Sequence, residues 1–130
     1  MPKPTIQEAQ FFLEVYKMWN EQSVQTAKNW ILANFYPKSW DDFNEHVAPP
    51  GSAERQMVDT VFGQFELIGT FVKVGVLNED ILFNAMGSFV PIWQRAQPII
   101  SGWRDERGAD MWENYEYLIE AQKRWVAARG

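Results

Sequence analysis

The sequence predicts an all-α fold, a compact bundle of about five to seven helices joined by short loops. Three observations support this. Apolar residues recur at three- and four-residue steps, the spacing of one helix face. Residues typical of helix caps separate these segments. Strand-type alternation and Asn-Gly or Asp-Gly hairpin turns are missing. We expect one domain over residues 1–130, since a chain of this length builds one core.

Cap signals order the first half of the chain. Residues 5–8, TIQE, fit a capping box that opens the first helix. Residues 20–23, NEQS, interrupt it before a second helix, which Pro37 ends. Residues 39–42, SWDD, open a short helix, and residues 48–52, APPGS, form the clearest loop.

The second half follows the same logic. Ser52 can cap a long helix that Gly75 ends. Asn78, followed by two acidic residues that suit the positive end of a helix, opens a short one. Another long helix follows residues 87–88, and Asp110 is expected to cap the last helix.

Composition narrows the classes of partner and site. The net charge of −5 argues against nucleic acid, which requires a basic surface. With no cysteine, disulfides, thiolate metal sites and cysteine nucleophiles are excluded, and the cytoplasm is the expected compartment. Charged residues interrupt the longest apolar window, so no integral membrane segment is expected.

Glu66 lies inside the most apolar stretch of the chain, residues 62–75. At about 100° per residue it falls on the polar side of the long helix, in one stripe with Asp59 and Lys73. Three interpretations stay open: a solvated stripe, a structural ion pair with another helix, or a ligand-binding or catalytic carboxylate. For an ion pair, Arg104 is the preferred partner, because it borders the apolar line of its own helix.

Asp42 and His46 are weak candidates for metal binding. On a helix they lie four residues apart and could present two ligands on one face. A catalytic metal needs a third protein ligand, and the chain has no second histidine. We therefore predict no metal and no cofactor, and interpret these residues as a helix-end acid and a surface histidine.

Seven tryptophans are spread over nearly every predicted helix. Aromatic residues at helical spacing most often form core, and the core is the main role we expect for them. Trp93 and Trp103 are candidates for an aromatic pocket between helices. Trp40, on a short helix, and Trp125, near the chain end, are candidates for an exposed partner surface.

The order of these segments resembles a family of small bacterial all-helical domains, the domain of unknown function 4760. The resemblance rests on FELIGTFVKVGVLNEDILFNAMG at residues 65–87, Trp93, WRDERG at residues 103–108 and YEYLIE at residues 115–120, and covers about residues 58–125.

This resemblance implies a helical fold and supplies no activity or catalytic residue. By motif position, Glu66, Trp93 and Arg104 match the more characteristic positions, which implies structural roles. Many relatives carry an N-terminal membrane helix, and we expect none within this chain.

Taken together, these observations predict a non-enzymatic interaction or scaffold module that could self-associate as a homodimer or bind another protein. One alternative is a binder of small molecules, with Glu66 or Arg104 fixing a polar group beside the aromatic pocket. A second is a metal-assisted enzyme in which Asp42, His46 and another carboxylate converge.

Overall fold

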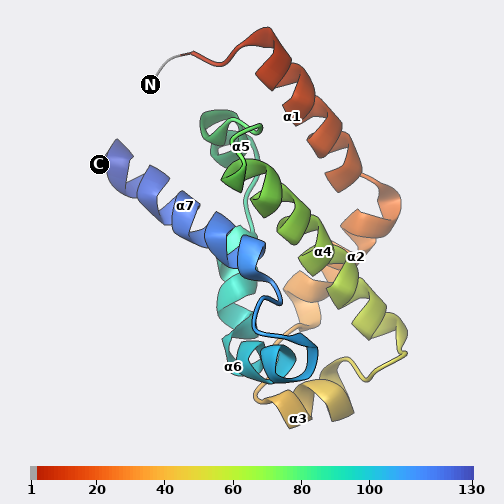
Figure 1. The fold of residues 1–130 in the computed structure, drawn as a ribbon. Coiled ribbons are helices and arrows are strands. Elements are labelled where there is room, and N and C mark those ends of the chain that lie inside the picture. The colour runs from red at the N-terminus through yellow and green to blue at the C-terminus, as the bar shows by residue number, and fades with distance from the viewer. Residues whose placement is uncertain (1–2) are drawn as a thin grey trace.

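The computed structural model describes residues 3–130, which form seven α-helices and one π-helical turn, with no strand among them (Figure 1). The prediction of an all-α fold is confirmed. The elements in chain order are α1 (Ile6–Trp19), α2 (Gln22–Asn34), α3 (Trp40–Asp42), η1 (Phe43–Val47), α4 (Ala53–Lys73), α5 (Glu79–Ala85), α6 (Phe89–Arg107) and α7 (Glu113–Arg129).

Local side-chain caps mark the starts of α1, α3, α4 and α5. Thr5 and Glu8 form the predicted capping box, in which each side chain accepts a hydrogen bond from the other residue's backbone N–H. Ser39, Ser52 and Asn78 each accept the backbone N–H three residues further on, at the starts of α3, α4 and α5. These bonds satisfy donors that the first helical turn leaves free.

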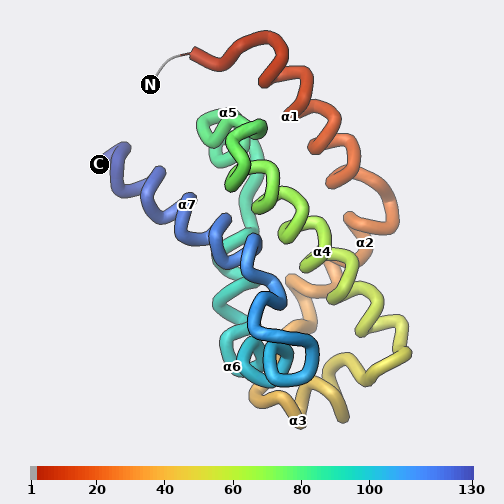
Figure 2. The backbone as a smooth tube through the Cα atoms, in the orientation of Figure 1, coloured from red at the N-terminus to blue at the C-terminus, as the bar shows by residue number. Residues whose placement is uncertain are grey.

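Helix α4 runs diagonally across the molecule and makes the most extensive helix-to-helix contacts, first with α7 and then with α2 (Figure 1). The smooth trace shows α1 and α7 on either side of α4 (Figure 2). Side-chain contacts tie α1 to α4, because the rings of Phe11 and Phe71 meet edge to face with 5.0 Å between their centroids. The start of α1 and the end of α7 both contact α5. The side chain of Asn78, the N-cap of α5, donates a hydrogen bond to Glu8 on α1, and the Trp125 indole on α7 donates one to Asp80 on α5.

Aromatic rings fill the centre of the core. Phe62 lies fully buried, with its centroid 5.2 Å from Trp103, 5.5 Å from Trp112 and 5.3 Å from Tyr115. Rings of this size bury large apolar areas and favour tilted and edge-to-face packing. The aromatic surplus in the sequence is therefore used mainly in this core.

None of the described helices is long and apolar enough to cross a bilayer.

Tyr115 joins α7 to α6 inside this core. Its hydroxyl donates to the carbonyl oxygen of Phe89 at 2.8 Å, and burial raises the pKa of the phenol well above 10.

Tyr115→Phe is expected to lower the free energy of unfolding by about 1–2 kcal/mol at pH 7, since it removes a buried hydrogen bond. The wild type should also lose stability above pH 10, by about 1.4 kcal/mol per pH unit, because the unfolded chain ionises this phenol first. Urea unfolding between pH 7 and pH 11 measures both effects. An equal alkaline loss in the variant would show that other groups cause it.

Candidate functional site

The carboxylate of Glu66, on α4, caps the first turn of α7. Its Oε1 accepts the backbone N–H of Asn114 at 3.1 Å and that of Tyr115 at 3.0 Å, and its Oε2 is 3.3 Å from the Asn114 nitrogen. The Asn114 side chain also donates to Thr70 Oγ1 at 3.0 Å, one turn further along α4. A negative group here satisfies free N–H donors and complements the helix dipole.

This cap from a distant helix corrects the expected start of the last helix. Asp110 was expected to be its N-cap, but α7 begins at Glu113, and Trp112 holds the cap position with a positive φ of 62°. That backbone conformation is unfavourable for a bulky residue. The Trp112 indole is buried against Phe62 and Trp103. Glu66 replaces the missing local cap.

Arg104 does not pair with Glu66, which corrects the predicted ion pair. Its Nη2 lies 2.8 Å from Glu116 Oε1, and its Nε donates to the carbonyl of Met111 at 2.9 Å. Glu66 instead uses both oxygens on backbone donors of α7. Both residues thus stabilise the start of α7. Glu66 caps its first turn, and Arg104 binds the loop that precedes it.

Gly69 lets α4 and α7 approach this closely. A Cβ atom at this position would overlap the carbonyl group of Asn114. The capping distance of Glu66, one turn earlier on α4, depends on this close approach.

Trp93 and Trp103 are both buried in the core. Trp93 packs on Tyr115, at 4.8 Å between centroids, and Trp103 packs on Phe43 and Phe62, each at 5.2 Å. Neither lines any of the three surface hollows described below. The structure uses both rings as packing elements.

The two tryptophans predicted for a partner surface are half-buried. Trp40 lies against Trp103 and over Gly102, where an added Cβ would overlap its ring. Trp125 donates its indole N–H to Asp80 at 2.8 Å, and the guanidinium of Arg129 stacks over its ring. Intramolecular contacts thus occupy much of each ring.

Asp42 and His46 lie close together, as their spacing predicted. His46 Nδ1 is 3.4 Å from Asp42 Oδ1, and Asp42 Oδ2 accepts the backbone N–H of Lys38. No group of three potential metal ligands gathers anywhere within residues 3–130. We therefore interpret Asp42 as a helix-end acid and His46 as an exposed histidine beside it.

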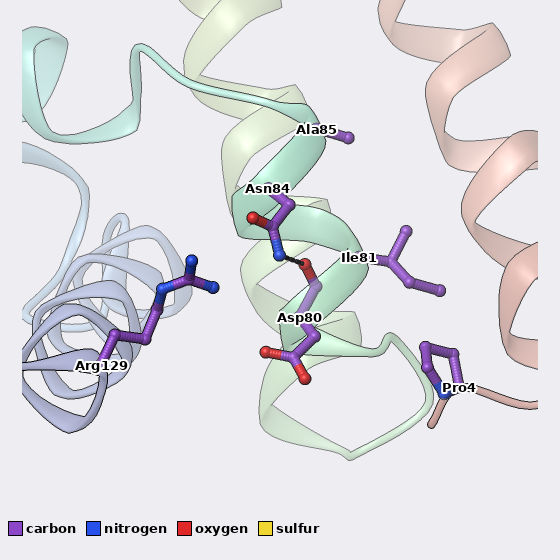
Figure 3. A pocket seen from close by; sticks show the side chains of 6 residues that line it. All are labelled: Pro4, Asp80, Ile81, Asn84, Ala85 and Arg129. Atoms are coloured by element: carbon purple, nitrogen blue, oxygen red, sulfur yellow. Dashed lines mark hydrogen bonds between the residues drawn. The ribbon is translucent and has the colours of Figure 1, made fainter. Parts of the chain in front are cut away.

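Three open hollows mark the described surface. The first, of about 500 Å³, lies where the N-terminal segment, α5 and the end of α7 meet. Figure 3 shows Arg129 reaching from α7 toward α5, where the Asn84 amide donates to the backbone carbonyl of Asp80. The second hollow lies between Val90 and the end of α7, and the third lies along α1. Two charged side chains at the rim of the first hollow already have a partner within the chain. Asp80 accepts the indole N–H of Trp125, and the guanidinium of Arg129 stacks over the Trp125 ring.

Sequence reasoning missed an uncharged strip on the outer side of α4, here called the α4 ridge. At 100° per residue its six members fall within an arc of about 80°, and all are exposed or half-buried. They are Gln56, Thr60, Gly63, Leu67, Thr70 and Val74.

On the helical wheel Gly63 and Thr70 fall on the same side of α4 as Asp59, Glu66 and Lys73. In the structure the Glu66 carboxylate binds the backbone of α7. Burial raises the pKa of Asp59, and the positive charges of Arg55 and Arg107 partly oppose this increase. Removing the charged residues from the wheel would have revealed the ridge in the sequence.

Most of the exposed large apolar side chains among residues 3–130 belong to two helices and one turn. Of the eight found among the described residues, six belong to α1, to the end of α4 or to the turn that follows α4. These six are Ile6, Leu13, Tyr16, Leu67, Val74 and Val76. Where exposed apolar side chains form a contiguous patch, the patch is typical of a surface that binds other proteins.

Comparison with known proteins gives one family match. No curated protein and no solved structure matches the chain. A family model, described as a domain of unknown function (DUF4760), matches residues 4–125, nearly the whole chain, and confirms the resemblance inferred from the residues. The chain therefore belongs to the DUF4760 family of domains of unknown function.

Proposed function

We propose that this chain is a non-enzymatic protein-interaction module that binds its partner through the outer side of α1 and α4. The observation that carries the proposal is the concentration of six of eight exposed large apolar side chains on those helices and the following turn. Apolar anchors with a polar surround supply most of the energy in protein interfaces.

The roles found for the candidate chemical groups support the same conclusion. Glu66 and Arg104 bind the backbone around the start of α7, and Trp93 and Trp103 fill the core. Each of these side chains is explained by folding. Most of the exposed apolar residues on α1 and α4 make no ring contact or side-chain hydrogen bond within the described residues, and binding is the role we propose for them.

Site-specific photo-crosslinking in the native host tests the proposal. A photoreactive amino acid placed at Leu13 or Leu67 should give discrete protein adducts, because the interface would cover both positions. The matched control places it at Gln94, an exposed polar position on α6, where adducts should be absent. Equal labelling at all three positions, or no adduct at either test position, would contradict the proposal. The adduct mass also separates a second copy from another protein.

A further inference from the structure

The side of α7 that packs on the core continues beyond the residues that the core covers. Tyr115 and Ile119 are buried on this side. At 100° per residue Gln122 and Val126 fall within the same arc of about 60° as these two residues. Val126 is nevertheless 57% exposed, and α6 contributes only Val90, from its first turn, to the lining of the hollow there. The core-facing side of α7 therefore ends in a partly uncovered hollow, the second of the three described above.

This second hollow has the size and lining of a small ligand site. Its volume of about 320 Å³ lies within the roughly 300–1,000 Å³ typical of such sites. Apolar side chains form most of its lining, which consists of Val90, Gln122, Lys123, Val126 and Ala127. Of the three hollows described on residues 3–130, it is the one whose lining contains no acidic residue, since Asp80 lines the first and Glu14 the third. An anion is therefore best accepted here.

The charge around the second hollow is positive, although the whole chain carries −5. Residues 121–130 contain Lys123, Arg124 and Arg129 and no acidic residue. The negative end of the α7 dipole, equivalent to about half a charge, offsets only part of this. Lys123 Nζ lies 3.5 Å from Glu120 Oε1, but both side chains are more than half exposed, and such a pair contributes little. The Lys123 ammonium can therefore exchange Glu120 for a carboxylate held at the hollow.

Gln122 brings an amide group to the same hollow. Its Oε1 is buried and has no hydrogen-bond partner within residues 3–130. Because no donor holds this oxygen in place, the amide can turn and present its NH2 group to an acceptor. A carboxylate at the hollow would meet two donors, the Lys123 ammonium and the Gln122 amide. Hydrogen bonds from both donors are stronger to a charged acceptor than to a neutral one.

We propose that the second hollow binds a small carboxylate with an apolar body, of the kind represented by a short-chain fatty acid. The carboxylate contacts Lys123 and the Gln122 amide, and the apolar chain lies against Val90 and Val126. This site goes beyond the proposed function and does not depend on it, since its lining residues belong to α6 and α7. Because the hollow is open and the ligand is small, the Kd is expected to be about 1 mM.

Titration of the ¹⁵N-labelled chain with hexanoate, followed by NMR, tests the site. Saturable shifts should appear at the backbone amides of Val90 and of residues 122–127. 1-Hexanol, the neutral analogue of the same chain length, should bind at least about threefold more weakly, because it lacks the charge that Lys123 attracts. Shifts that do not saturate, that lie elsewhere on the surface, or that 1-hexanol reproduces with equal affinity would overturn the proposal.

Lys123→Gln should raise the Kd for hexanoate about three- to tenfold and leave that for 1-hexanol unchanged, because it removes the positive charge and keeps most of the side chain. The matched control is Lys17→Gln. Lys17 also lines a hollow, the third, and also pairs with a glutamate three residues earlier, Glu14. This control should leave both Kd values unchanged. Equal effects of the two substitutions would show that hexanoate responds only to the net charge of the chain, and the proposed site would be wrong.

Gln122→Met keeps the length of the side chain and removes its amide. The Kd for hexanoate should rise about two- to fivefold, while 1-hexanol should bind at least as well as before. The melting temperature should not fall, because the oxygen that is removed has no partner within the described fold. A Kd for hexanoate that this substitution leaves unchanged would contradict the contact assigned to the Gln122 amide.

Discussion

Glu66→Ala is expected to lower the free energy of unfolding by about 2–3 kcal/mol. The substitution removes the acceptor for the Asn114 and Tyr115 backbone N–H groups at the start of α7. A lost helix cap costs about 0.5–2 kcal/mol, and hydrogen bonds to a charged group are worth more than neutral ones. The strained backbone of Trp112 should add to the effect, because it would have to hold its conformation without the cap.

Urea unfolding followed by circular dichroism at low protein concentration measures this loss. Glu66→Gln should lose about half as much, because its amide oxygen can still accept both backbone N–H groups but carries no negative charge. The matched control is Glu116→Ala, which breaks the partly exposed ion pair with Arg104 and should cost less than about 1 kcal/mol. Equal losses at positions 66 and 116 would show that the cap contributes no more than a surface ion pair.

Gly69→Ala should be the most destabilising single substitution considered, with a loss of about 3–4 kcal/mol or failure to fold. Its methyl group would overlap the backbone carbonyl of Asn114, which cannot move aside as a flexible side chain can. The helices α4 and α7 would have to separate, weakening both the Glu66 cap and the aromatic packing between them.

Gly63→Ala is the control for this substitution, since both glycines lie inside α4 and only their surroundings differ. Thermal melts in dilute solution should show opposite signs, a lower melting temperature at position 69 and a higher one at position 63. If the Gly69 variant does not fold, its absence from the soluble fraction beside a well-expressed Gly63 variant gives the same answer. A Gly69→Ala protein as stable as the wild type would show that the close approach of α4 and α7 is not required.

Caps and loops could be predicted from the sequence because they depend on residues three or four positions apart. The capping box of Thr5 and Glu8, the caps at Ser52 and Asn78, and the break before α2 all form as predicted. The family was predicted too, because its pattern follows the order of those helices. The start of α7 was wrong, since a local cap at Asp110 was assumed where a residue 48 positions away supplies one.

The candidate site was harder to predict. On a helical wheel Glu66 and Gly63 share one polar side, and the wheel does not show which neighbour covers which part of it. Glu66 could be a solvated acid, an ion-pair partner or a ligand group on that pattern alone, and the structure shows a fourth role as a helix cap. Arg104 was correctly placed near the apolar line of its helix, but it pairs with Glu116.

The sequence by itself determined that this protein is helical and where most helices begin and end. These properties follow from the local spacing of apolar and capping residues. Only the tertiary structure decided which donors meet Glu66, which glycines face a neighbouring helix and which part of α4 is left uncovered. Those contacts join residues far apart in the chain, and their geometry depends on how α1, α4 and α7 pack together.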